Sequence, residues 1–95
     1  MTSRVARLGG RLFRYQLTLV LQEARRPMTV AEMVVVLRRL GIDVPGRASK
    51  TISDALRWEI GRGRVRRTAP GTYAFDRMPA STGRWMRSEL HRTRP

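Results

Sequence analysis

The chain has 95 residues, 41% of them hydrophobic, which is enough for one domain with a single modest core. Its formal net charge is +13, from 20 Lys and Arg residues against 7 Asp and Glu. Because such an excess destabilises a compact chain by self-repulsion, it indicates a polyanionic partner. The chain has no cysteine, which excludes disulfides and thiolate metal sites. With no signal-peptide core and no apolar run near the roughly 18 residues that cross a bilayer, we expect a cytoplasmic protein.

The basic residues are unevenly distributed, and this divides the chain into three parts. We expect a flexible basic arm over residues 1–10, a folded domain over residues 11–76 and a basic tail over residues 77–95. The centre of the chain is nearly balanced in charge and should supply most of the core.

The first helix is predicted from Arg11 to Arg25, where apolar residues recur at helical spacing. These residues are Phe13, Leu17, Val20, Leu21 and Ala24. Pro27 ends the helix, because the residue before a proline disfavours the α region.

The second helix has a clear predicted start. Thr29 and Glu32 have the spacing of a capping box, in which each side chain satisfies a backbone N–H of the first turn. An apolar stripe follows, and Gly41 is a natural residue just past the end of the helix. The stripe consists of Met33, Val34, Leu37 and Leu40.

The third helix is predicted from Ser49 to Ile60, with Gly61 as its stop. Its apolar side consists of Ala48, Ile52, Ala55, Leu56 and Ile60. The opposite side carries Lys50, Asp54 and Arg57, with Ser53 and Trp58 flanking them. Glu59 falls within the apolar sector, and because a buried carboxylate needs a partner, we expect it near the rim of the core, paired with an arginine.

A β-hairpin is predicted after the third helix. Pro70 and Gly71 suit the two central positions of a type II turn between arms at residues 65–68 and 72–75. Tyr73 and Phe75 alternate with small residues and should face inward. Since two short strands are unstable alone in water, this hairpin should pack on the helices.

Three helices followed by a hairpin predict an α+β fold: a winged helix, with a helix-turn-helix and a two-stranded C-terminal wing. The run from Pro27 to Phe75 also resembles winged-helix domains of the HARE-HTH type. The resemblance lies in the proline and Thr cap before the second helix, in an I-S-x-x-L-x-x-x-I pattern, and in a G-T-Y-A-F strand. The pattern residues are Ile52, Ser53, Leu56 and Ile60, and the strand is residues 71–75. The resemblance implies duplex DNA binding, although some winged helices bind proteins or RNA instead.

The third helix would be the recognition helix, because the second helix of a helix-turn-helix enters the major groove. Its candidate DNA-binding residues are Arg47, Ser49, Lys50, Ser53 and Arg57. Arg and Lys donate to guanine, and Ser donates to bases or phosphate. An ordinary solvated helix face is an equally good interpretation of this helix taken alone.

The first arm of the hairpin carries four more candidates, Arg62, Arg64, Arg66 and Arg67. Because neighbouring residues of a strand point to opposite faces, they cannot all contact one ligand. We expect Arg64 and Arg66 to point outward, Arg67 to be partly packed on the face of Val65, and Arg62 to meet phosphate.

Both ends of the chain offer further interactions. Arg4, Arg7 and Arg11 could follow a minor groove, or belong to a leader with no role. In the tail, Ser81 or Thr82 could cap a short helix containing Trp85, Met86 and Leu90. This helix would dock either on its own domain or on a second copy, forming a homodimer.

No pattern favours catalysis. His91 is the only histidine, the carboxylates are scattered, and no Gly-rich phosphate loop is present. We therefore expect a non-catalytic protein without metal or cofactor that binds double-stranded DNA, as a transcription regulator or a nucleoid-associated protein. The alternatives are a protein-interaction module that docks on a larger assembly, which an exposed Trp58 and Trp85 would favour, and a protein that binds structured RNA.

Overall fold

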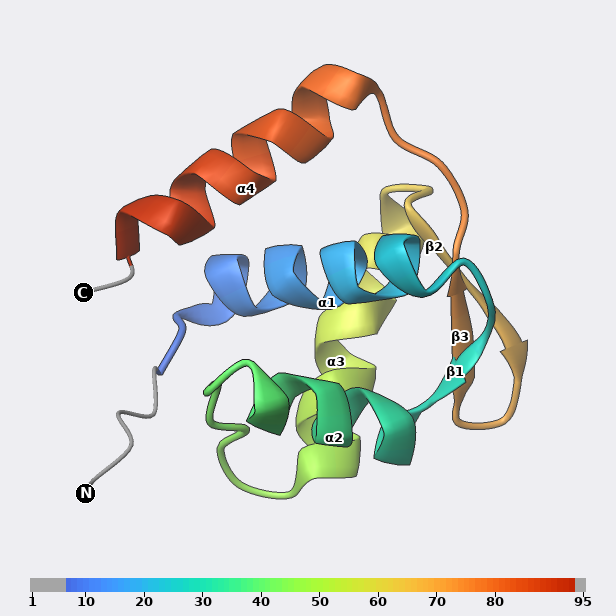
Figure 1. Cartoon of the computed structure of the whole chain (residues 1–95). Helices are drawn as coiled ribbons and strands as arrows, with labels where there is room; N and C mark the ends of the chain where they lie inside the picture. The colour runs from blue at the N-terminus through green and yellow to red at the C-terminus, as the bar shows by residue number, and fades with distance from the viewer. Residues whose placement is uncertain (1–6, 94–95) are drawn as a thin grey trace.

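The computed structural model describes residues 7–93 of the chain. It is a small α+β fold with four helices and one three-stranded antiparallel sheet (Figure 1). The elements, in chain order, are α1 (Gly10–Ala24), β1 (Met28–Thr29), α2 (Val30–Arg39), α3 (Ala48–Gly61), β2 (Val65–Ala69), β3 (Thr72–Phe75) and α4 (Ala80–Thr93).

The sheet has the strand order β1-β3-β2, so β3 is its central strand. The predicted hairpin is present as β2 and β3, with Ala69 opposite Thr72 across the turn and Gly71 at the positive φ of 66° that a type II turn requires of its third residue. The third strand, β1, was not predicted, because two residues are too few for an alternating pattern. It pairs Met28 with Tyr73, and the N–H of Val30 donates to the carbonyl of Gly71 over 3.0 Å.

The predicted capping box of α2 is confirmed. The Thr29 side chain accepts a hydrogen bond from the N–H of Glu32, and the Glu32 carboxylate accepts one from the N–H of Thr29. At the other end Gly41 has φ 75°, the left-handed conformation expected just past the helix. Because Thr29 is also the last residue of β1, the cap joins α2 directly to the sheet.

The main core lies between α1, α2, α3 and the inner face of the sheet. Its fully buried side chains include Leu17, Leu21, Met33, Leu37, Ile52 and Leu56. Two members of the predicted apolar stripes lie outside it: Leu40 is 44% exposed and Ile60 is 38% exposed. Both lie at the C-terminal ends of their helices, where the apolar stripe extends beyond the elements that cover the rest of it.

A second, smaller cluster joins α1 to α4. Leu19 of α1 packs there with Met86 and Leu90 of α4, and Leu12 and Tyr15 border it. Leu12, Tyr15 and Leu19 follow the helical spacing i, i+3, i+7 and form a second apolar stripe on α1. The tail helix is therefore longer than predicted, begins at Ala80 ahead of Ser81 and Thr82, and docks on its own chain.

No helix among residues 7–93 is both long and apolar enough to span a membrane.

Candidate nucleic-acid interface

The outer face of α3 is a stripe of exposed polar residues. Ile52 and Leu56 are fully buried on the inner side, so Lys50, Asp54 and Arg57 point to solvent. Lys50 and Asp54 form an i,i+4 ion pair, Nζ to Oδ2 3.0 Å. Arg57 is in no ion pair with any residue that the structure describes, so its guanidinium is available to a ligand.

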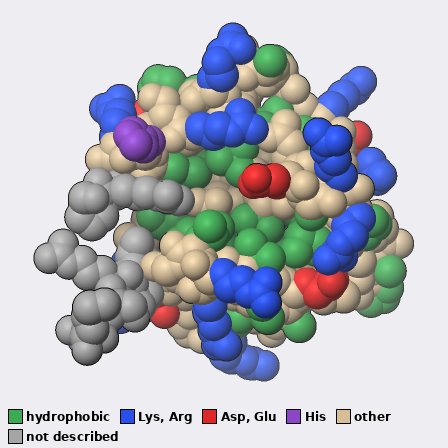
Figure 2. Space-filling model, in the orientation of Figure 1, with side chains coloured by type: hydrophobic (Ala, Val, Ile, Leu, Met, Phe, Trp, Pro, Cys, Tyr) green, Lys and Arg blue, Asp and Glu red, His purple; other side chains and the backbone are tan. Residues whose placement is uncertain are grey.

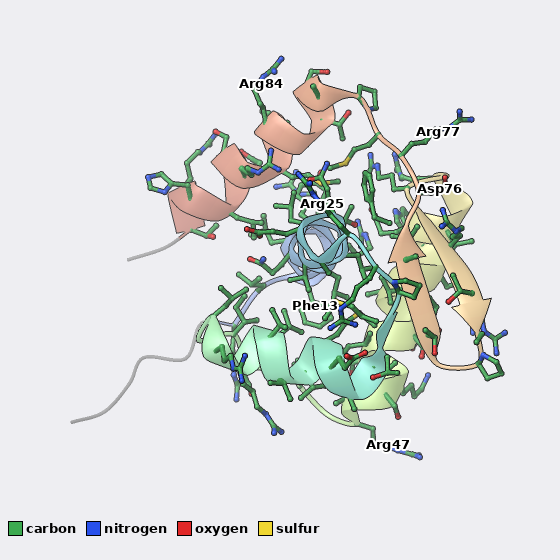
Figure 3. All side chains as sticks on the ribbon, turned by 45° about the vertical axis from the view of Figure 1, so that its right-hand side comes forward. Phe13, Arg25, Arg47, Asp76, Arg77 and Arg84 are labelled. Atoms are coloured by element: carbon green, nitrogen blue, oxygen red, sulfur yellow. The ribbon has the colours of Figure 1, made fainter. Side chains whose placement is uncertain are left out.

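The N-terminal end of α3 is open and basic. Arg47 is the N-cap residue, but its side chain makes no capping hydrogen bond. Arg47 points away from the body of the protein at this end of the helix (Figure 3). Ser49, in the first turn, is exposed, so two of the predicted DNA-binding residues flank a helix N-terminus, where free N–H groups favour an anion.

Ser53 is turned toward the sheet. It is half-buried, and its Oγ accepts a hydrogen bond from the hydroxyl of Tyr73 over 3.5 Å. Since Tyr73 lies on β3, this contact fixes the middle of α3 against the hairpin. Ser53 is thus less available to a ligand than its neighbours Lys50 and Arg57.

Trp58 of α3 contacts two arginines, Arg14 of α1 and Arg62, the residue that directly follows α3. Its ring is 52% exposed, with the guanidinium carbon of Arg14 at 4.6 Å and that of Arg62 at 5.6 Å from the ring centroid. Such cation–π contacts hold an arginine in place without neutralising its charge. Arg62 is exposed, and it therefore extends the basic surface of α3 toward the hairpin.

Glu59 lies deeper than expected. It is fully buried rather than at the rim, and its carboxylate accepts a hydrogen bond from Thr18 Oγ1 at 2.8 Å. The predicted arginine partner is Arg64, whose Nη1 donates to Oε1 at 3.2 Å, and Arg14 Nε lies 3.8 Å from Oε2. Thr18, in the middle of an apolar run, was the sequence signal for this buried polar contact.

The prediction that Arg64 points outward is therefore wrong. Only 18% of its side chain is exposed, because the buried Glu59 carboxylate holds the guanidinium against the end of α3. Its backbone N–H also donates to the Glu59 carbonyl, at 3.1 Å. Arg64 fixes the base of the hairpin and contributes no free charge to the surface.

Arg66 and Arg67 are both exposed on β2. Arg66 was predicted to point outward and does, with a long 3.8 Å contact to Asp76. Arg67 lies opposite Tyr73 and so shares the face of Val65 as predicted, but it is exposed rather than partly packed. The register of the hairpin is irregular between Arg67 and Ala69.

Taken together, α3 and the hairpin present a surface with an excess of free positive charge. Asp54 and Glu59 are the only acidic residues between Arg47 and Ala69. Asp54 is paired with Lys50 and Glu59 with Arg64. The exposed basic side chains without a close carboxylate partner among the described residues are Arg47, Arg57, Arg62 and Arg67, and Arg66 has only the long contact with Asp76.

The predicted arm lies at the other end of α1. Arg4 lies outside the described residues, Arg7 pairs with Asp43 at 3.3 Å, and Arg11 is already in α1, bound to Glu89 of α4 at 3.2 Å. Figure 1 shows α1 beginning on the left, with the sheet at its far right end. The structure therefore does not bring Arg7 and Arg11 together with the hairpin arginines.

The tail residues divide between the interior and the surface. Met86 and Leu90 are buried against α1, so a homodimer formed through them would require α4 to leave its place, whereas Trp85 is 52% exposed. His91 is exposed. Among residues 7–93, no group of three or more His, Cys, Asp or Glu is arranged to hold a metal ion.

No protein-family model, no curated protein and no solved structure matches the chain. Any functional conclusion therefore depends on the fold and on the surfaces described above.

Proposed function

We propose that the protein is a winged helix-turn-helix protein that binds double-stranded DNA without catalysing a reaction, and that it acts as a transcription regulator or a nucleoid-associated protein. The order α1–β1–α2–α3–β2–β3 supports this assignment, since it is the order of a helix-turn-helix followed by a wing. The resemblance of residues 27–75 to HARE-HTH-type domains points in the same direction.

The observation that carries the proposal is the charge of the surface shared by α3 and the hairpin. Its acidic residues are neutralised within the chain, while exposed arginines extend from Arg47 through Arg57 to Arg67. Arginine binds phosphate in a bidentate manner and is weakly hydrated, so these side chains suit a nucleic-acid backbone.

In the proposed complex, α3 enters the major groove with its N-terminal half nearest the bases. Arg57 and Lys50 are the residues placed to donate to guanine, and Ser49 and the helix N-terminus would meet a phosphate. Asp54 would accept from cytosine N4 or hold Lys50 in position. Ser53 would act through its contact with Tyr73, by keeping the helix and the hairpin in register.

The hairpin is the proposed wing. Arg66 and Arg67 are adjacent on β2 and point to opposite faces of the strand. This arrangement suits a strand that lies between two phosphate backbones, as in a minor groove, since each face meets one wall. Most of the affinity would come from such phosphate contacts, and base readout by α3 would be modest.

A protein-interaction module is the second candidate, because Trp58 and Trp85 are both exposed and aromatic residues are typical anchors of interfaces. Trp58 nevertheless lies between arginines on the basic surface, and so a ligand there would have to be anionic as well.

A mobility-shift titration with duplex DNA at low salt tests the proposal. We expect binding below about 1 μM, and better competition by duplex DNA than by duplex RNA, because A-form RNA hides its major groove from a helix. Arg57→Ala should weaken binding, whereas Arg84→Ala, on the far side of the molecule in α4, should not. Failure to bind duplex DNA under these conditions would favour the protein-interaction module.

A further inference from the structure

A broad hollow lies on the face of the protein formed by α1, α2 and α4, with a volume of about 1050 Å³. Its floor is apolar and draws on all three helices. Leu19 and Val20 come from α1, Val36 from α2 with Leu40 just past its end, and Leu90 from α4. Figure 2 shows hydrophobic surface on this face with Lys and Arg side chains around it and one acidic side chain near its centre. Neither the proposed wing nor the outer face of α3 contributes to it.

The rim of the hollow is basic. Arg25 and Arg26 stand at the C-terminal end of α1, and Arg87 stands on α4 across from them. Arg26 is paired with Glu32, and Arg87 donates to Gln22 at 3.0 Å. Glu23 is the one carboxylate among the lining residues, so the rim has an excess of positive charge.

We propose that this hollow, the α1–α4 groove, is a docking site for an acidic amphipathic helix of a partner protein. The floor would take the apolar stripe of that helix and the rim arginines its flanking carboxylates. The groove follows α1 from Gln16 to Ala24, about 12 Å at 1.5 Å per residue, which matches about two turns of a bound helix.

Charge and shape separate this occupant from the others. A second copy of a chain with net charge +13 would bring like charge to a basic rim. Duplex DNA would bury the apolar floor against phosphates, and a flat bilayer cannot fill a concave floor. An apolar helix with Asp or Glu along its edges satisfies both the floor and the rim.

The groove and the proposed DNA surface lie on different sides of α1. The helix α3 packs on α1 through Ile52, Leu56 and Glu59 and turns its basic face away, while α4 and the groove lie across α1 from it (Figure 1). The protein could therefore hold DNA and a partner helix at the same time. The docking site does not depend on the DNA-binding proposal and can be tested separately.

The test is fluorescence anisotropy with a labelled peptide of about 14 residues, held helical by a lactam bridge, with Leu at i, i+3, i+4 and i+7 and Glu on the flanks. A control peptide carries Lys in place of each Glu. We expect saturable binding of the acidic peptide and about tenfold weaker binding of the lysine peptide.

Protein variants locate the site. The double variant Arg25→Glu, Arg87→Glu should lower affinity for the acidic peptide about tenfold, and so should Leu40→Gln, an exposed floor position. The matched control is Arg77→Glu, Arg84→Glu, which makes the same charge change at side chains that point outward in Figure 3. Arg57→Glu, on the proposed DNA surface, should leave peptide binding unchanged.

Equal losses in the groove and control double variants, or a loss with Arg57→Glu, would show that the peptide is held by net charge alone and would overturn the proposal. So would equal binding of the two peptides. Thermal melting of each variant shows whether it is folded. If the double variant Arg25→Glu, Arg87→Glu does not fold, Leu40→Gln still tests the groove.

Discussion

Glu59 is a fully buried carboxylate at the junction of α1, α3 and the hairpin. Arg14 and Thr18 of α1 and Arg64, which directly precedes β2, surround it. A buried ion pair contributes little net stability as a whole, but removing one partner leaves the other charge uncompensated. Glu59 thus acts by holding the base of the hairpin to the helices.

We predict that Glu59→Gln lowers the free energy of unfolding by about 3 kcal/mol, because the shape is kept while Arg14 and Arg64 lose their counter-charge. Urea denaturation of the two proteins measures the difference. If the variant is as stable as the wild type, Arg14 and Arg64 do not need the negative charge of Glu59, and the ion pairs with Glu59 do not stabilise the hairpin.

The hairpin arginines should separate into two kinds. Arg66→Ala and Arg67→Ala should each weaken duplex DNA binding by about threefold to tenfold with an unchanged melting temperature, since both side chains are exposed. Arg64→Ala should instead lower the melting temperature, because it removes the closer of the two arginines that compensate the buried Glu59 carboxylate and leaves only Arg14, at 3.8 Å. Anisotropy and thermal melting of all three variants check this, and an effect of Arg66 or Arg67 on stability alone would contradict their assignment to the DNA surface.

At the scale of the elements, the Glu32 carboxylate stabilises the N-terminus of α2. The backbone N–H of Thr29 and then the side chain of Arg26 hydrogen-bond to Glu32, and together they hold the pKa of Glu32 below its usual value of 4.5. A lowered folded-state pKa stabilises the fold above the unfolded pKa, and this contribution is lost as the pH falls through the folded pKa.

We therefore predict that wild type is more stable than Glu32→Gln near pH 7, and that the difference shrinks as the pH falls below about 4.5. Glutamine keeps the shape and can still accept the hydrogen bond from Thr29, so the difference isolates the charge. Urea denaturation at several pH values measures it. A difference that stays constant down to about pH 3 would contradict the role of the ionised carboxylate.

Sequence patterns predicted the three helices of the domain and the hairpin, because their signals are local: periodic apolar residues, the Thr29 and Glu32 cap, and Pro70-Gly71. They missed β1, since two residues carry no period and Met28 joins the sheet only by pairing with Tyr73 across the fold. They also misplaced Glu59 and Arg64, whose burial depends on Thr18 of a helix 41 residues away in sequence. Thr18 stands out as a polar residue within an apolar run, but no local pattern pairs it with Glu59, because the contact between them is tertiary.

The exposed arginines were found from the sequence as a group, but their individual roles were not. Arg64, Arg66 and Arg67 look alike along the strand, and only the register of β2 against β3 and the contact with Glu59 separate them. The α1–α4 groove had no sequence signal either. It arises where α4 packs across α1, and the second apolar stripe of α1, Leu12, Tyr15 and Leu19, marks the contact with α4 but not the groove itself.

At the scale of the whole molecule, the net charge of +13 is only partly available to a ligand. On the proposed DNA surface Lys50 is neutralised by Asp54 and Arg64 by Glu59. The remaining exposed side chains there are Arg47, Arg57, Arg62, Arg66 and Arg67. We expect them to neutralise about five phosphates of a bound duplex.

The salt dependence of duplex DNA binding tests this account most directly. The logarithm of the association constant should fall with the logarithm of the salt concentration with a slope of about −4.5, from about 0.9 per phosphate, and Arg57→Ala should reduce its magnitude by about 0.9. Arg84→Ala should leave the slope unchanged. A slope near zero, or one that Arg84→Ala changes as much as Arg57→Ala does, would contradict a DNA interface formed by α3 and the hairpin.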